Sequence, residues 1–174
     1  MAGNPVLGFL SVQPTGDGPH AVVTKMLRLL GIVVLVGFVF SLLNSVLLLA
    51  MGDAYYGGAA MGFMAAGAVG AIIIGALITG VVLWWITFTI THWVNRDPRG
   101  STHALIIAII ATVFGAIGVL GVFGLFAATA YPIYLLLNLV SVLIAGAELY
   151  CGIMILMNRG KATAGANTPM GATN

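Results

Sequence analysis

The stretch LLGIVVLVGFVFSLLNSVLLLA, from Leu29 to Ala50, decides the fold. It carries no charge, and as an α-helix it would be about 33 Å long, enough to cross the roughly 30 Å hydrocarbon core of a bilayer. The whole chain agrees, because 61% of its residues are hydrophobic and only 6% are charged, against roughly a quarter in soluble domains. We therefore predict an integral membrane protein.

Three more apolar runs without Lys or Arg follow the first. The predicted spans are 29–50, 59–92, 104–128 and 132–157, which make an all-α bundle of four antiparallel transmembrane helices over residues 25–158. Segment 1–24 has no basic residue before its apolar stretches, so it does not resemble a signal peptide. The predicted C-terminal cytoplasmic tail is 159–174, and its small and polar stretch 160–174 is expected to be disordered on its composition.

The six basic residues set the predicted orientation. They precede the first span, separate the second from the third, and follow the fourth: Lys25, Arg28, Arg96, Arg99, Arg159 and Lys161. All six therefore fall on one side of the predicted bundle. Because cytoplasmic loops are enriched in Lys and Arg, we predict a multi-pass protein of the inner or plasma membrane with both termini in the cytoplasm.

Turn-forming residues mark the predicted connections. The run from Asn95 to Gly100 is dense in them, and we expect Ser101 or Thr102 to cap the third helix. A short turn near Thr129 to Tyr131 should follow the third helix, and Pro132 suits the first turn of the fourth.

Small residues recur every four positions in three of the spans, a spacing that lets helix backbones approach closely in lipid. The rows are Gly37, Ser41 and Ser45; Gly58, Gly62, Ala66 and Gly70; and Ala104, Ala108 and Thr112. One interpretation is packing within a single bundle. The other is that one row, above all that of the long second span, docks a partner protein.

Glu148 is the outstanding polar residue, since it lies about 14 Å from the inner end of the fourth span. Asn138, Ser141 and Glu148 share one helical face by their spacing, so the carboxyl group should point into protein rather than lipid. At the same depth on other spans we expect Gly37, Trp84 and Thr112, so the Trp84 indole N–H and the Thr112 hydroxyl are the expected hydrogen-bond partners of Glu148. Either Glu148 belongs to a proton- or cation-coupled site, or it is a protonated hydrogen-bond donor between helices.

The other polar residues give weaker signals. Asn44 is expected to bridge helices or line a cavity. His92 and His103 bracket the inner loop, but their spacing matches no ligand motif, so we predict neither a metal site nor a cofactor. Cys151 is expected to be a buried inert thiol. Because GxSxG, Walker, HExxH and paired CxxC signatures are absent from the sequence, we predict no enzymatic activity.

The layout of four short-looped spans with brief polar tails resembles the small accessory subunits of actinobacterial envelope assemblies, including Mce-type lipid importers and respiratory supercomplexes. The resemblance covers the whole chain and rests on no diagnostic motif. Small multidrug-resistance transporters also have four spans and a membrane glutamate, but theirs lies in the first helix, unlike Glu148.

Three functions are open at this point. The leading hypothesis is a non-catalytic accessory subunit that packs against larger integral membrane proteins and lipids, and binds no nucleic acid. The second is a small oligomeric, proton-coupled transporter or channel that uses Glu148 and Asn44. The third is a membrane redox anchor that uses His92 and His103.

Overall fold

The computed structural model describes residues 6–14, 16–56, 58–126 and 132–166, and their side chains over 6–14, 16–47, 67, 69–121 and 135–164. A short 3-10 helix, η1 (Gly8–Leu10), precedes four long helices, which are α1 (Pro19–Tyr56), α2 (Gly58–Val94), α3 (Pro98–Phe126) and α4 (Pro132–Ala166). Each long helix contains a stretch long and apolar enough to cross a membrane. The prediction of an all-helical chain with four such segments is confirmed.

The helices are longer than the apolar runs within them. Helix α1 begins at Pro19, inside the segment expected to precede the first span, because proline has the backbone angle of a first helical turn. Helix α4 starts at Pro132 as predicted but continues to Ala166, so residues 160–166, expected to be disordered, are helical. The glycine-rich start of α2 is helical from Gly58. The turn predicted at 129–131 lies outside the described residues.

The connection between α2 and α3 is tighter than predicted. The amide of Asp97 donates to the carbonyl of His92 at 2.9 Å, and that of Arg96 donates to Trp93 at 3.0 Å. This is a Schellman ending, with Arg96 in the left-handed region at φ 56° where glycine is usual. Asp97 then caps α3, since its side chain accepts from the Arg99 amide at 2.9 Å. The expected cap at Ser101 or Thr102 was therefore wrong.

Ser101 has a different role, which ties α3 to α4. The Arg159 Nε donates to the Ser101 carbonyl at 2.8 Å and to its hydroxyl at 3.1 Å. The Arg159 guanidinium therefore donates to two acceptors of Ser101 in the first turn of α3. This turn precedes residue 104, where the predicted third span begins.

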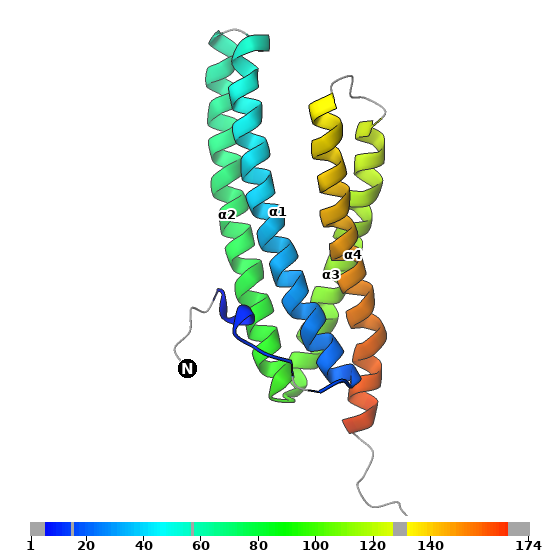
Figure 1. Ribbon diagram of the computed structural model, residues 1–174. Coiled ribbons are helices and arrows are strands. Elements are labelled where there is room, and N and C mark those ends of the chain that lie inside the picture. The colour runs from blue at the N-terminus through cyan, green and yellow to red at the C-terminus, as the bar shows by residue number, and fades with distance from the viewer. Residues whose placement is uncertain (1–5, 15, 57, 127–131, 167–174) are drawn as a thin grey trace, which may run out of the picture.

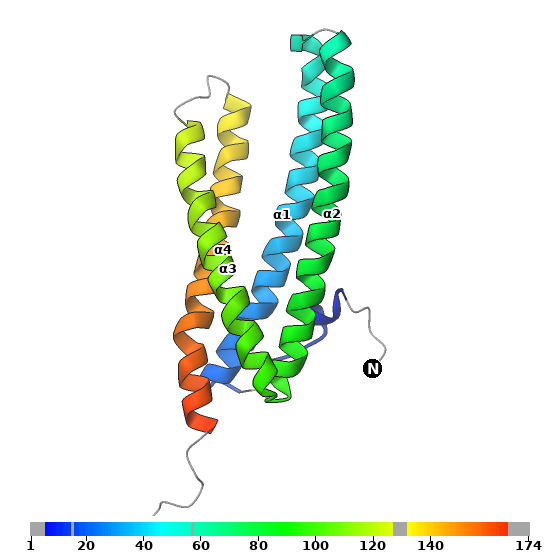
Figure 2. The same cartoon turned by 180° about the vertical axis from the view of Figure 1, so that it is seen from behind.

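The helices form two pairs, α1 with α2 and α3 with α4. Figures 1 and 2 show that the pairs lie close together at one end of the molecule and diverge toward the other, where α1 and α2 reach further. The start of α1, the α2–α3 connection and the end of α4 all lie at the close end (Figure 1). All six basic residues belong to these segments, so the positive charge is concentrated at that end.

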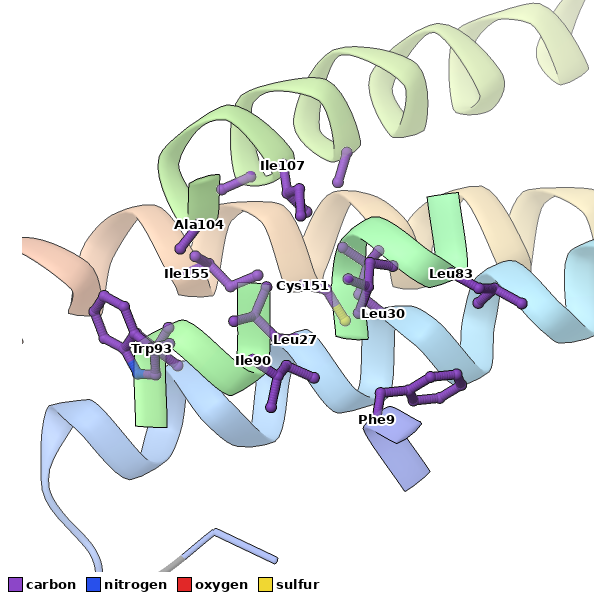
Figure 3. Packing of buried hydrophobic residues seen from close by; sticks show 14 residues of the cluster. Phe9, Leu27, Leu30, Leu83, Ile90, Trp93, Ala104, Ile107, Cys151 and Ile155 are labelled. Atoms are coloured by element: carbon purple, nitrogen blue, oxygen red, sulfur yellow. The ribbon is translucent and has the colours of Figure 1, made fainter. Parts of the chain in front are cut away.

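The buried core lies where the pairs meet. Figure 3 shows its side chains converging from all four long helices and from η1. Leu27, Ile90, Cys151 and Ile155 are fully buried within it, as is Phe9 of η1. The predicted burial of Cys151 is confirmed. This core joins the two pairs toward the basic end, and α1 also approaches α4 further along, where Gly37 faces Ile144.

Helices α3 and α4 make the closest backbone approach. A Cβ atom added to Gly115 would lie 2.6 Å from the backbone nitrogen of Leu149, and one added to Gly152 would lie 2.8 Å from the Ala108 carbonyl oxygen. Only glycine fits at these distances, since ordinary contacts of a Cβ begin at 3.4 Å. The small-residue row Ala104, Ala108 and Thr112 therefore packs within the chain, against α4.

Candidate functional site

Glu148 of α4 lies between two adjoining cavities. The first has a volume of about 320 Å³ and is lined almost wholly by apolar side chains of α1, α2 and α3, with Glu148 as its one carboxyl group. The second, of about 260 Å³, is lined by residues of α1, α3 and α4. We call them the apolar cavity and the polar cavity. Glu148 and Phe114 line both, so the two cavities adjoin at these residues.

The polar cavity brings together several of the residues singled out in the sequence. Ser41 and Asn44 come from α1, and Ser141 and Glu148 come from α4. The Ser141 hydroxyl donates to the Leu137 carbonyl within its own helix at 3.1 Å. Asn44 and Glu148, by contrast, make no hydrogen bond to any residue that the structure describes. Two strong hydrogen-bonding groups are therefore left free to bind something in the cavity.

Two expected neighbours of Glu148 lie elsewhere. Trp84 is 49% exposed on the outside of α2 and stacks on Phe88. Thr112 donates to the Ala108 carbonyl at 2.7 Å and lies against Gly152. Equal depth placed both residues at the level of Glu148, but depth says nothing about which way a helix is rotated. Asn138 is not among the residues that line the two cavities.

Trp85, one position further along α2, lines the apolar cavity in place of Trp84. One residue turns a helix by about 100°, which moves a side chain from lipid to the interior. The Trp85 indole nitrogen donates to Nδ1 of His103 at 3.1 Å. This aromatic ring was missed in the sequence, as was Phe114, because neither stands out from its apolar neighbours.

The small-residue rows divide into packed and open ones. Gly37 of α1 faces α4, where an added Cβ would lie 3.3 Å from Ile144. Ser45 donates to the Ser41 carbonyl at 2.9 Å within α1. On α2, no described residue lies within 4 Å of the place where a Cβ of Gly67 or Gly70 would be. The side chains predicted at Gly58, Gly62 and Ala66 lie outside those that the structure describes.

The two histidines of the inner loop both contact Phe88 and make different hydrogen bonds. The ring of His92 lies 3.9 Å from that of Phe88, and its Nδ1 is 2.9 Å from the Phe88 carbonyl oxygen. His103 takes the Trp85 hydrogen bond and meets Phe88 edge-on. Among the described residues, no group of three His, Cys, Asp or Glu side chains could hold a metal ion. The redox-anchor hypothesis therefore gains no support from these contacts.

The N-terminal segment contributes a contact that the sequence did not suggest. Phe9 is fully buried against α1, where an added Cβ on Gly31 would lie 2.7 Å from the Phe9 ring. The Phe9 amide donates to the Thr87 hydroxyl at 3.3 Å, and that hydroxyl donates to the Val6 carbonyl at 3.3 Å. Thr87 thus satisfies backbone groups of η1 and of the residue Val6 that precedes it, beside α2. Stacking of His20 on Trp93 fixes the start of α1 to the end of α2.

No protein-family model matches the chain, and neither a curated protein nor a solved structure shows significant similarity to it.

Proposed function

We propose that the four helices cross the cell membrane as an antiparallel bundle with both termini in the cytoplasm. The concentration of Lys and Arg at one end supports this orientation, since basic residues are retained on the cytoplasmic side. A single cysteine at the exposed position Thr102, in a Cys151→Ala background, tests it. We expect no reaction with a membrane-impermeant thiol reagent in intact cells, and labelling from outside would reverse the topology.

The proposed role is that of a non-catalytic accessory subunit that packs against larger proteins of a lipid-import or respiratory membrane complex. The observation that carries it is an uncovered stripe on α2, which we call the open α2 face: Gly67, Gly70, Ile74, Leu77 and Val81. The spacing of these residues places them on one side of the helix. Ile86 and Ile90, which face the core, lie on the opposite side.

The contrast between glycines explains why the open α2 face favours a partner. Gly115 and Gly152 touch a facing backbone, so their lack of a side chain is used inside the chain. Gly67 and Gly70, by contrast, meet nothing within 4 Å of a built Cβ among the residues whose side chains the structure describes. In lipid, helices associate through close backbone approach rather than through a hydrophobic drive, and small residues make such approach possible. A transmembrane helix of another protein fits this role.

Affinity purification from native membranes in mild detergent, followed by native mass spectrometry, tests the proposal. We expect the tagged chain to bring a defined set of larger membrane proteins with it. Gly70→Leu should lose them, whereas Gly121→Leu should not, because a Cβ built at Gly121 of α3 likewise meets no described residue within 4 Å but lies away from the open α2 face. Recovery of the chain alone, or equal loss with both variants, would count against a docking role for α2.

A second candidate function is a proton-coupled transporter or channel, and the free Glu148 and Asn44 groups in the polar cavity favour it. Polar groups at this depth in a membrane commonly mark a path for ions or substrates. The test is pH-dependent flux through proteoliposomes that contain the purified chain. Glu148→Gln should abolish the pH dependence, and unchanged flux between acidic and neutral pH would remove this candidate.

A further inference from the structure

The two cavities beside Glu148 have opposite chemical character. The apolar cavity is lined by Val34, Val82, Ile110 and similar side chains and is partly open to the surface of the bundle, which suits a hydrocarbon chain or ring. The polar cavity offers a carboxyl group, an amide and two hydroxyls. Because Glu148 lines both, a molecule that enters both would place its polar end beside the carboxyl group and its apolar end among α1, α2 and α3.

The residues that line the two cavities include an acidic side chain and no basic one. Glu148 is the only ionisable residue that lines either cavity, so the described residues provide an acid and no base. The basic residues of the chain all lie at the close end of the molecule, about 16 Å along α4 from Glu148 in the case of Arg159. A carboxylate in an apolar setting is costly unless a cation pairs with it. A cationic ligand would supply the positive charge that no residue lining the two cavities supplies.

We infer that the adjoining cavities bind an amphiphilic amine, with its ammonium group beside Glu148 and Asn44 and its hydrocarbon chain in the apolar cavity. The carboxylate accepts a charge-assisted hydrogen bond from the ammonium group, and the Asn44 amide oxygen accepts a second. The inference concerns binding alone. It therefore holds whether the chain acts as a subunit or moves the ligand across the membrane, and it does not depend on the open α2 face.

Trp85 provides the readout, since its ring lines the apolar cavity. The probe is an alkylamine with bromine at the far end of its chain, and the control is the bromoalkanol of the same length. Bromine quenches indole fluorescence on contact, so a probe bound as inferred quenches Trp85. In lipid nanodiscs with zwitterionic headgroups, we expect saturable quenching by the amine at concentrations at least tenfold lower than by the alcohol. Trp85→Phe should remove the saturable part and leave the quenching of lipid-exposed Trp84.

Two variants separate pairing with Glu148 from general attraction of a cation. Glu148→Gln keeps the size of the side chain and should weaken binding of the amine at least tenfold, while leaving that of the alcohol unchanged. Asp17→Asn removes one negative charge from a fully exposed side chain. It should change the binding of neither the amine nor the alcohol. The amine and alcohol are also compared on the unaltered chain, so the test survives a variant that misfolds.

The result that would overturn the inference is equal quenching by the amine and the alcohol in the unaltered chain. Equal weakening of both by Glu148→Gln would do the same, because it would assign the carboxyl group a structural role. A failure of flux with binding intact would remove the transporter function and leave the binding site. Loss of the partner proteins with binding intact would likewise affect only the subunit role.

Discussion

Substitution of Gly115 by alanine is the sharpest test of the packing between α3 and α4. The three atoms nearest to an added Cβ are Leu149 N at 2.6 Å, Ala145 O at 2.9 Å and Leu149 Cα at 2.9 Å. All belong to the backbone of α4, so no rotation of a side chain relieves the clash. Because ordinary contact begins at 3.4 Å, the helices must separate by about 0.8 Å (3.4 − 2.6 = 0.8) at this level.

The free energy of unfolding should fall despite the better helix propensity of alanine. Overpacking of a well-packed contact costs about 1–3 kcal/mol, and a gap of this size also forfeits a quarter to a half of the dispersion energy of the neighbouring contacts. Replacing a helical glycine by alanine returns about 0.5–1 kcal/mol. We expect a net destabilisation of about 1–2 kcal/mol.

Gly70→Ala is the matched control, because the same substitution there meets nothing within 4 Å. It should stabilise the isolated chain by about 0.5–1 kcal/mol. Reversible unfolding in mixed micelles of mild and denaturing detergent, followed by circular dichroism, measures both variants. If Gly115→Ala were as stable as the unaltered chain, or if both variants shifted together, the close approach of α3 and α4 would be refuted.

Three other substitutions test local features. Phe9→Ala should lower the unfolding free energy by about 3 kcal/mol, since the ring is fully buried against Gly31, and should expose residues 6–14 to limited proteolysis; unchanged cleavage would argue against its burial. Asp97→Ala should cost about 1 kcal/mol through loss of the α3 cap, whereas Ser101→Ala, which retains the Ser101 carbonyl, should cost less; the reverse order would restore the cap first expected. Arg96→Gly should raise stability by up to about 1 kcal/mol because φ 56° suits glycine, and a loss would contradict the left-handed turn.

Much of the architecture follows from composition, because a segment that crosses the hydrocarbon core of a bilayer must be a long apolar helix whose backbone hydrogen bonds are internal. The run from Leu29 to Ala50 and the start of α4 at Pro132 were both predictable from single stretches of sequence. The helix ends were not, since Pro19 and Ala166 lie in polar sequence where apolarity gives no signal. A helix continues there for as long as its residues tolerate the conformation.

The sequence predicted how deep the candidate site residues lie along their helices, but it did not predict how each helix is rotated about its own axis. Spacing along α4 placed Ser141 and Glu148 on one face, and both line the polar cavity. The expectation for Trp84 failed and Trp85 was missed, because the rotation of α2 about its own axis depends on contacts spread over all four helices. The burial of Phe9 was equally hidden, since the matching space is created by Gly31 on a different element.

The subunit role is tested most directly by photo-crosslinking from two equally exposed positions in native membranes. Leu77 on the open α2 face is 66% exposed, and Leu120 on α3 is 71% exposed. With a photoreactive amino acid at each position in turn, we expect position 77 to give a discrete crosslink to another membrane protein and position 120 to label lipid. Lipid labelling alone from both positions would contradict the proposal.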